Sequence, residues 1–146
     1  MSGLDILALG GVAIDVLLGA PTYPALGSET IGQTLHLRVG GSSTNTAVAG
    51  AGLGLRTGII AAVGQDHLGE IASRELAACS VDISGLHRRA GLPTSVSIVI
   101  VTPDGHRTMF GYIGASRNLG PQDVPDEAIC QAQVVHLTGY SLLAES

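Results

Sequence analysis

Three short apolar runs along the chain have the length and the flanking glycines of buried strands. They are LDILALG at residues 4–10, TGIIAAV at residues 57–63 and VVHL at residues 134–137. Uninterrupted apolar runs of this length are typical of parallel strands that are covered on both faces. We therefore expect a parallel sheet with helices packed against it.

Two helices are predicted between these strands. Small residues at helical spacing predict one over 44–54, after Gly40-Gly41, with the hydroxyl residues at 42–44 as candidate N-caps. The second runs from about 67 to 79, and Asp66 is placed to cap it, which gives Asp66 a structural role before a catalytic one. The alternation of strand and helix predicts an α/β fold.

A pair of β-rich runs departs from this alternation. Residues 95–101 and 107–113 flank TPDGH at 102–106, which predicts a hairpin in which Gly105 takes a positive φ. Residues 29–39 alternate loosely between apolar and polar after a turn-rich stretch. We expect the hairpin to pair with 29–39 as a flap over a ligand site. A short helix is expected at 125–130.

Composition narrows the function classes. The 146 residues are 45% hydrophobic with a net charge of −5 and a pI near 5.3, which favours one globular domain and argues against nucleic acid or an anionic membrane as partner. There is no lysine, so no Schiff-base or P-loop lysine exists in this sequence. No charged leader precedes the apolar N-terminus, and we expect a cytoplasmic location.

The cysteines and histidines suggest no special chemistry. Cys79 and Cys130 are far apart in sequence, and we expect both to be buried and inert. The five histidines lack a zinc-ligand spacing, so no metal site is predicted.

Asp15 and the start of the 44–54 helix are the candidate ligand-binding features. Ligands of open α/β sheets bind at the carboxyl ends of strands, and Asp15 follows the first strand closely. A helix start carries free N–H groups and a partial positive charge, and Gly40-Gly41 lets a polyhydroxylated or anionic ligand approach it. Alternatively, Asp15 is a turn or capping residue and the glycine-rich helix is only tightly packed.

Taken together, the motifs resemble the ribokinase-like (PfkB) carbohydrate kinases, whose first signature matches the run from Gly40 to Gly54. The resemblance rests on Gly40-Gly41 with Asn45, Ala47 and Gly54, the strand ending in GGxxxD at Asp15, the turn Gly64-x-Asp66-x-x-Gly69, and Gly105-x-Arg107 in the hairpin. It implies a ribokinase-like, doubly wound, mostly parallel sheet with a projecting β-strand lid. It also implies ATP-dependent transfer of phosphate to a hydroxyl of a sugar, nucleoside or related small alcohol.

The resemblance also implies roles for individual residues. In the family, the positions that match Asp15, Gly41 and Asn45 hold substrate hydroxyls, and lid positions that match Ser97 and Val99 cover the substrate. We expect Asp15 and Asn45 to lie in loops. The predicted substrate-binding residues are Asp15, Gly40, Gly41, Asn45, Ser97, Val99 and Gly139.

Some positions depart from the family pattern. Ala13 stands where ribokinases proper have Asn, and Thr138-Gly139 lacks their acidic residue, so ribose is doubtful. His136-Leu137-Thr138-Gly139 is more similar to other sugar and sugar-acid kinases. The family's second signature, a Gly-Ala-Gly-Asp loop with the catalytic base, has no counterpart; Gly50-Ala51-Gly52-Leu53 is the nearest string.

These departures predict that residues 1–146 are the N-terminal, substrate-binding part of a truncated kinase, with lid strands at about 21–39 and 94–113. ATP and Mg²⁺ belong to a complete family member, and we expect neither to bind this chain strongly. No catalytic residue is assigned, and the chain alone should not phosphorylate a substrate. Two alternatives remain: a non-catalytic module that binds a sugar or nucleoside-like molecule, and an interaction fragment that forms a homodimer through its lid strands.

Overall fold

The computed structural model describes residues 3–142 and contains two four-stranded sheets. The body sheet has the strand order β5-β4-β1-β8, and the lid sheet has the order β3-β2-β6-β7. The strands are β1 (Leu4–Leu9), β2 (Ala13–Gly19), β3 (Thr34–Gly40), β4 (Thr57–Gly64), β5 (Asp82–Arg89), β6 (Ser95–Val101), β7 (Arg107–Tyr112) and β8 (Ala132–Leu137). The helices are α1 (Ser42–Gly52), α2 (His67–Ala78) and α3 (Asp126–Cys130), with 3-10 turns η1 (Ala115–Asn118), η2 (Pro121–Asp123) and η3 (Gly139–Leu142).

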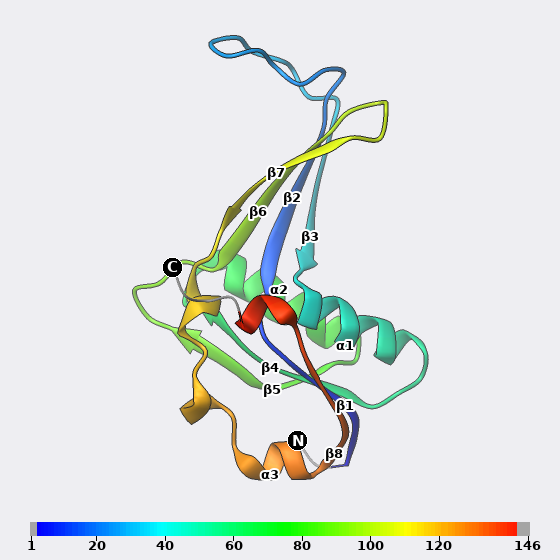
Figure 1. Cartoon of the computed structure of the whole chain (residues 1–146), viewed down its shortest axis with the longest axis vertical. Coiled ribbons are helices and arrows are strands. Elements are labelled where there is room, and N and C mark those ends of the chain that lie inside the picture. The colour runs from blue at the N-terminus through cyan, green and yellow to red at the C-terminus, as the bar shows by residue number, and fades with distance from the viewer. Residues whose placement is uncertain (1–2, 143–146) are drawn as a thin grey trace.

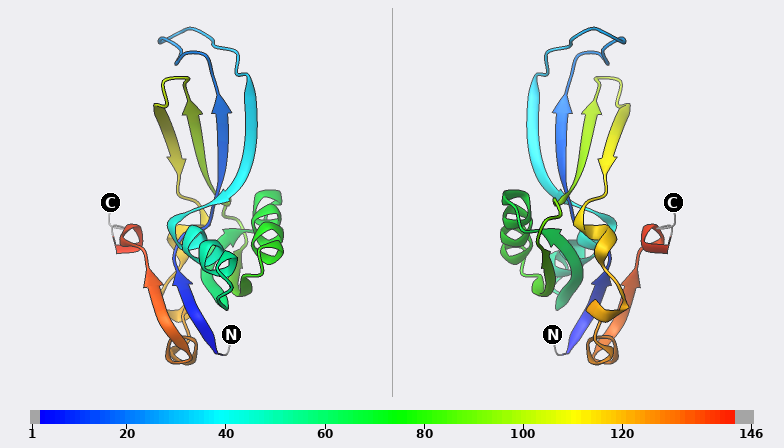
Figure 2. Two further views of the ribbon diagram at one scale, coloured as in Figure 1. Left: turned by 90° about the vertical axis from the view of Figure 1, so that its right-hand side faces the viewer. Right: turned by 90° about the vertical axis from the view of Figure 1, so that its left-hand side faces the viewer.

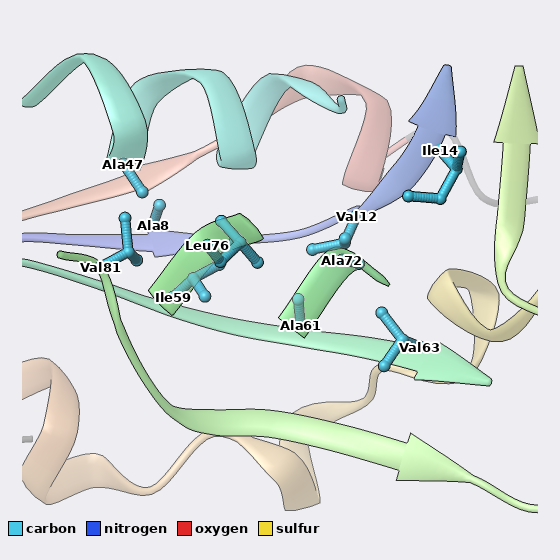
Figure 3. Close-up of a cluster of buried hydrophobic side chains, with 10 residues drawn as sticks. All are labelled: Ala8, Val12, Ile14, Ala47, Ile59, Ala61, Val63, Ala72, Leu76 and Val81. Carbon is cyan, nitrogen blue, oxygen red and sulfur yellow. The ribbon is translucent and has the colours of Figure 1, made fainter. Parts of the chain in front are cut away.

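The body sheet is parallel throughout and is covered on both faces. Helices α1 and α2 pack on one face, where Ala47, Leu76 and Ile59 belong to one buried cluster (Figure 3). On the other face, Leu7 and Ile60 pack beneath the segment that carries η1, η2 and α3. Apolar runs in β1 and β4 thus find cover on both sides, which is why neither strand alternates. The predicted fold class, a mostly parallel α/β sheet with a projecting lid, is confirmed.

The lid sheet projects from the end of the body (Figures 1 and 2). Strand β2 runs antiparallel to β3 and parallel to β6, and β7 completes the sheet. The predicted hairpin of β6 and β7 is confirmed, including a φ of 82° at Gly105. Its predicted pairing with 29–39 is wrong, because β2 lies between β3 and β6.

Strand β2 was not predicted, and neither was β5. Three residues separate the segment Ala13–Gly19 from β1, and the double glycine among them resembles a turn into a loop. Instead, Gly10 takes a φ of 139° and redirects the chain from the body into the lid. Strand β5 is charged at its end because it lies at the edge of the body sheet.

Several predicted details also change. Strand β8 was expected to be buried, but Val134 is 56% exposed because β8 is an edge strand among the described residues. Both Cys79 and Cys130 are exposed, which contradicts the prediction of buried thiols; each lies where a helix ends, at the C-cap of α2 and the last residue of α3. In the described part of the chain, no helix has the length and apolar character needed to cross a membrane.

Candidate functional site

A row of residues crosses the lid sheet at the level of Asp15. The strand register pairs Asp15 of β2 with Arg38 of β3 on one side and with Ser97 of β6 on the other. Because side chains alternate between the two faces of a sheet, the side chains of these three residues lie on the same face of the lid. We call this the inner face; Ile14, Val16 and Ile98 leave on the opposite, outer face.

The Asp15 carboxylate leans toward the base of the lid. A Cβ placed on Gly40 would collide with the carboxylate of Asp15, so the side-chain space of Gly40 is filled by that group. This is the physical reason for a glycine at the end of β3. Asp15 is half-buried, burial raises the pKa of its carboxyl, and no hydrogen bond to the carboxylate is found within residues 3–142.

Gly41 follows as the N-cap of α1. Its φ of 105° suits glycine, and a Cβ there would strike the Gly11 carbonyl oxygen, so two bends of the chain pack together at the lid base. No side chain caps the helix, and its first turn has no acidic residue. The positive end of the helix dipole is therefore left without a counter-charge from its own first turn.

The hydroxyl residues do not cap α1 as predicted, because the helix begins earlier, at Ser42. Ser43 donates from Oγ to the Leu9 carbonyl oxygen at 2.7 Å, which ties the helix to the end of β1. The Thr44 hydroxyl is buried with no hydrogen-bond partner among the described residues.

Asn45 and Asp15 lie in regular secondary structure. Asn45 is exposed in α1, and its backbone N–H bonds to the Gly41 carbonyl at 2.9 Å, while Asp15 lies within β2. The prediction that both occupy loops is therefore wrong. The double glycines at 10–11 and 40–41 hid these elements, because each lies at or close to the junction of two successive elements and resembles a loop.

The floor of the site is where β1, β8 and α1 meet. A Cβ on Gly10 would collide with the Ser43 and Ser141 hydroxyl oxygens and the Thr138 methyl carbon, so these three side chains converge there. Gly139 directly follows Thr138 at the start of η3. The carboxyl ends of two parallel strands and a helix N-terminus thus lie together, which is where open α/β sheets bind ligands.

The predicted lid residues lie above this floor. Ser97 and Val99 share the inner face with Asp15, and Val99 is buried. Two neighbours on that face were not predicted: Met109, opposite Val99 on β7, and Arg38. The hairpin register could have identified Met109, whereas Arg38 required knowledge of β2.

Asp66 does not belong to this set and has the structural role expected of it. Its carboxylate accepts hydrogen bonds from the Gly69 N–H at 2.8 Å and from the Thr94 N–H and hydroxyl at 2.8 and 2.6 Å. Burial raises the pKa of Asp66, but these hydrogen bonds together lower it below its ordinary value. Asp66 therefore caps α2 and fastens that turn to the start of β6.

Hydroxyl hydrogen bonds also connect β6 at the base of the lid, through η1, to the segment between β1 and β2. The Ser95 hydroxyl donates to Ser116 Oγ at 2.8 Å, and Ser116 Oγ donates to the Val12 carbonyl at 3.0 Å. On the outer face, Val39 N–H donates to a Glu75 carboxylate oxygen of α2 at 3.0 Å. The sequence pattern indicated none of these contacts.

Two hollows of the surface lie away from this set. One, of about 490 Å³, is at the tip of the lid and is lined by Tyr23, Ile100 and Thr108 among others. The other, of about 280 Å³, lies by His87 and Asp123 under the body sheet. The residues predicted from the sequence line neither of these two hollows.

Residues 5–146 match the profile of the pfkB family carbohydrate kinases. The chain belongs to this family. It is 33% identical to an ATP-dependent ribose-1-phosphate kinase of Halopiger xanaduensis over 91% of this chain and 45% of that protein. A nucleoside kinase of Methanothermobacter thermautotrophicus is 31% identical over 91% and 43%, respectively.

Solved structures of ribokinase-like proteins have the same fold as this chain. A putative ribokinase from Agrobacterium tumefaciens superposes with a TM-score of 0.83 at 21% identity, covering 92% of this chain and 44% of that one. This pfkB family chain thus spans less than half the length of the relatives that it matches.

Proposed function

We propose that this chain forms the substrate-binding part of an ATP-dependent kinase that phosphorylates a hydroxyl of a sugar, a nucleoside or a related small alcohol. The observation that supports it best is the Asp15 carboxylate, which lies against Gly40 beside the uncapped start of α1 and lacks a hydrogen-bond partner in the described chain. A half-buried carboxylate of this kind is a strong acceptor for ligand hydroxyls.

The other predicted residues complete the binding surface. Gly41 and Asn45 present backbone and amide groups at the first turn of α1, and Gly139 continues the floor from β8. Ser97 and Val99 cover the ligand from the lid, one with a hydroxyl and the other with an apolar surface. The mixture of hydroxyl-binding and apolar groups suits a sugar ring, which has both polar edges and apolar faces.

Mg²⁺ finds no cluster of candidate protein ligands in the described chain. Residues 3–142 hold no group of three or more His, Cys, Asp or Glu residues placed to bind a metal ion, and the sequence has no lysine. In this proposal the chain's own residues bind and orient the acceptor and shield it from water, and we assign none of them as the base that takes the hydroxyl proton.

Two measurements test the proposal on the 146-residue chain. Calorimetric titration with sugars and nucleosides should show that at least one binds without ATP, and Asp15→Asn should weaken that binding. Asp82→Asn is the matched control, because Asp82 is also a partly buried strand aspartate but lies on β5, outside the site. Failure of every tested sugar and nucleoside to bind would reject the proposal.

An ATP turnover assay in magnesium buffer separates a kinase part from a complete catalyst. We expect no substrate-dependent ADP release from this chain alone, because positioning and charge stabilisation around the transferred phosphate dominate phosphoryl transfer. Binding without turnover also fits a non-catalytic module. A longer gene product that carries a Gly-Ala-Gly-Asp loop and turns over ATP would decide for the kinase.

We also propose that two copies associate through their lids. The outer face carries Leu35, Ile98 and Phe110, which are 60%, 44% and 57% exposed, respectively. An apolar sheet face of this kind is typical of an interaction surface.

A further inference from the structure

Arg38 is the basic residue closest in register to the candidate acceptor site. It lies directly opposite Asp15 on the neighbouring strand and shares the inner face with it. Across the same row, Ser97 pairs with Gly111 on β7, where a Cβ would meet nothing within 4 Å. The row therefore presents a cation, a carboxylate and a hydroxyl in succession, with open space at its far end.

The Arg38 guanidinium is not engaged by any carboxylate in the described chain. Its one hydrogen bond there is from Nη1 to the neighbouring Leu37 carbonyl, at 3.4 Å. The ion pairs found among residues 3–142 use Arg56, His67, Arg89 and His106, not Arg38. Opposite charges facing each other across two strands ordinarily pair. Here the Asp15 carboxylate leans toward Gly40, so the guanidinium stays free.

The surroundings add positive potential at this point. The start of α1, three residues beyond Arg38 at Gly41, has no side-chain cap and no acidic residue in its first turn. Arg38 and the positive end of α1 thus lie close together in a chain whose net charge is −5.

We propose that Arg38 is a specificity-determining residue that binds an anionic group of the acceptor, either a phosphate or a carboxylate. The site then prefers a phosphorylated or acidic sugar to a neutral one. A guanidinium makes paired hydrogen bonds with either group. Neighbouring strands are about 4.8 Å apart, so one small molecule reaches both Arg38 and Asp15. This inference rests on the proposed function, because it assigns the substrate class of the same site.

The test is calorimetric titration of the 146-residue chain with three probes: ribose, ribose 1-phosphate and gluconate. We expect at least one anionic probe to bind about 10-fold to 100-fold more tightly than ribose, the range for hydrogen bonds to charged groups. Arg38→Gln should remove that preference and change ribose affinity less than about 2-fold, since the neutral sugar makes no charge-assisted bond to this side chain. Arg38→Lys, which keeps the charge but loses the paired geometry, should retain part of the preference.

Arg107→Gln is the matched control. Arg107 leaves the inner face too, but it pairs with Val101, four residues beyond Ser97 along β6 and about 13 Å away. Its loss removes the same charge without removing the proposed contact, and the preference should persist. Thermal melts of all variants establish that each is folded.

The outcomes separate this inference from the proposed function. Equal affinity for ribose and both anionic probes, or an Arg38→Gln effect that Arg107→Gln reproduces, overturns the role of Arg38 and leaves a sugar-binding site intact. If none of the sugars and nucleosides binds, the proposed function fails and this inference fails with it. Tighter binding of ribose 1-phosphate than of gluconate assigns a phosphate, and the reverse order assigns a carboxylate.

Discussion

The two sheets of this protein differ in how their residues are covered. All eight residues of β4 in the body sheet are buried, whereas all six residues of β7 in the lid are exposed. In both strands, half of the residues are of the β-branched or aromatic types that favour β structure. The body is thus stabilised by its own packing, while β7 of the lid has both faces available to a ligand or a partner. Substitutions in the two sheets should therefore affect different measurements.

The largest expected effect is on the stability of the body. Ile59→Ala removes a fully buried side chain and should lower the free energy of unfolding by about 2–5 kcal/mol. Ile98→Ala in the lid removes the same atoms from a side chain that is 44% exposed, and it should cost about 1 kcal/mol or less. Urea unfolding of both variants measures the difference. Similar losses would mean that the lid is covered in solution as fully as the body.

The second effect is on binding rather than stability. Asp15→Asn should weaken the binding of a sugar or nucleoside by about 1.5–3 kcal/mol, because a charged acceptor is replaced by a neutral one. Burial raises the pKa of Asp15 above its unfolded value, so wild-type stability declines as pH rises through the folded pKa. At pH 7 the Asn variant should therefore melt no lower than wild type. A collapsed melting temperature would give Asp15 a structural role instead.

The third effect is at the junction of body and lid. Asp66→Asn should cost about 0.5–2 kcal/mol at pH 7, because the amide keeps one acceptor oxygen for the Gly69 N–H but loses the charge and the second acceptor oxygen that Thr94 uses. The pKa of Asp66 is lowered in the folded state, so its contribution is present above the unfolded value of 3.8 and is lost as pH falls through the folded pKa. Denaturation curves from pH 7 to acid should show wild type and variant converging. A pH-independent difference would contradict this assignment.

The sequence predicts the body better than the lid, for physical reasons. A buried parallel strand has an uninterrupted apolar sequence, as in Thr57–Gly64. Asp66 directly precedes the helical pattern of α2, which is the position of an N-cap. Strand β2 is not evident in the sequence because glycines lie at or near both of its ends, and glycines are also typical of a loop. The partners of Asp15 depend on a register between segments far apart in sequence. Arg38 could not be placed beside Asp15 until β2 and β3 were known to pair.

The smallest expected effect is lid association, which should be weak and dependent on concentration. Phe110 and Met109 are adjacent on β7 and almost equally exposed, at 57% and 56%, but they leave on opposite faces of the lid. If the outer face joins two copies, Phe110→Ser should shift the chain toward monomer, because a serine hydroxyl replaces an aromatic contact. Met109→Ser is the control with a similar loss of exposed apolar surface, and it should leave the association unchanged. Sedimentation velocity over a range of micromolar concentrations reports the result directly. Equal weakening by both substitutions would indicate nonspecific attraction between apolar surfaces, and a wild-type chain that stays monomeric throughout would leave the lid with its ligand role alone.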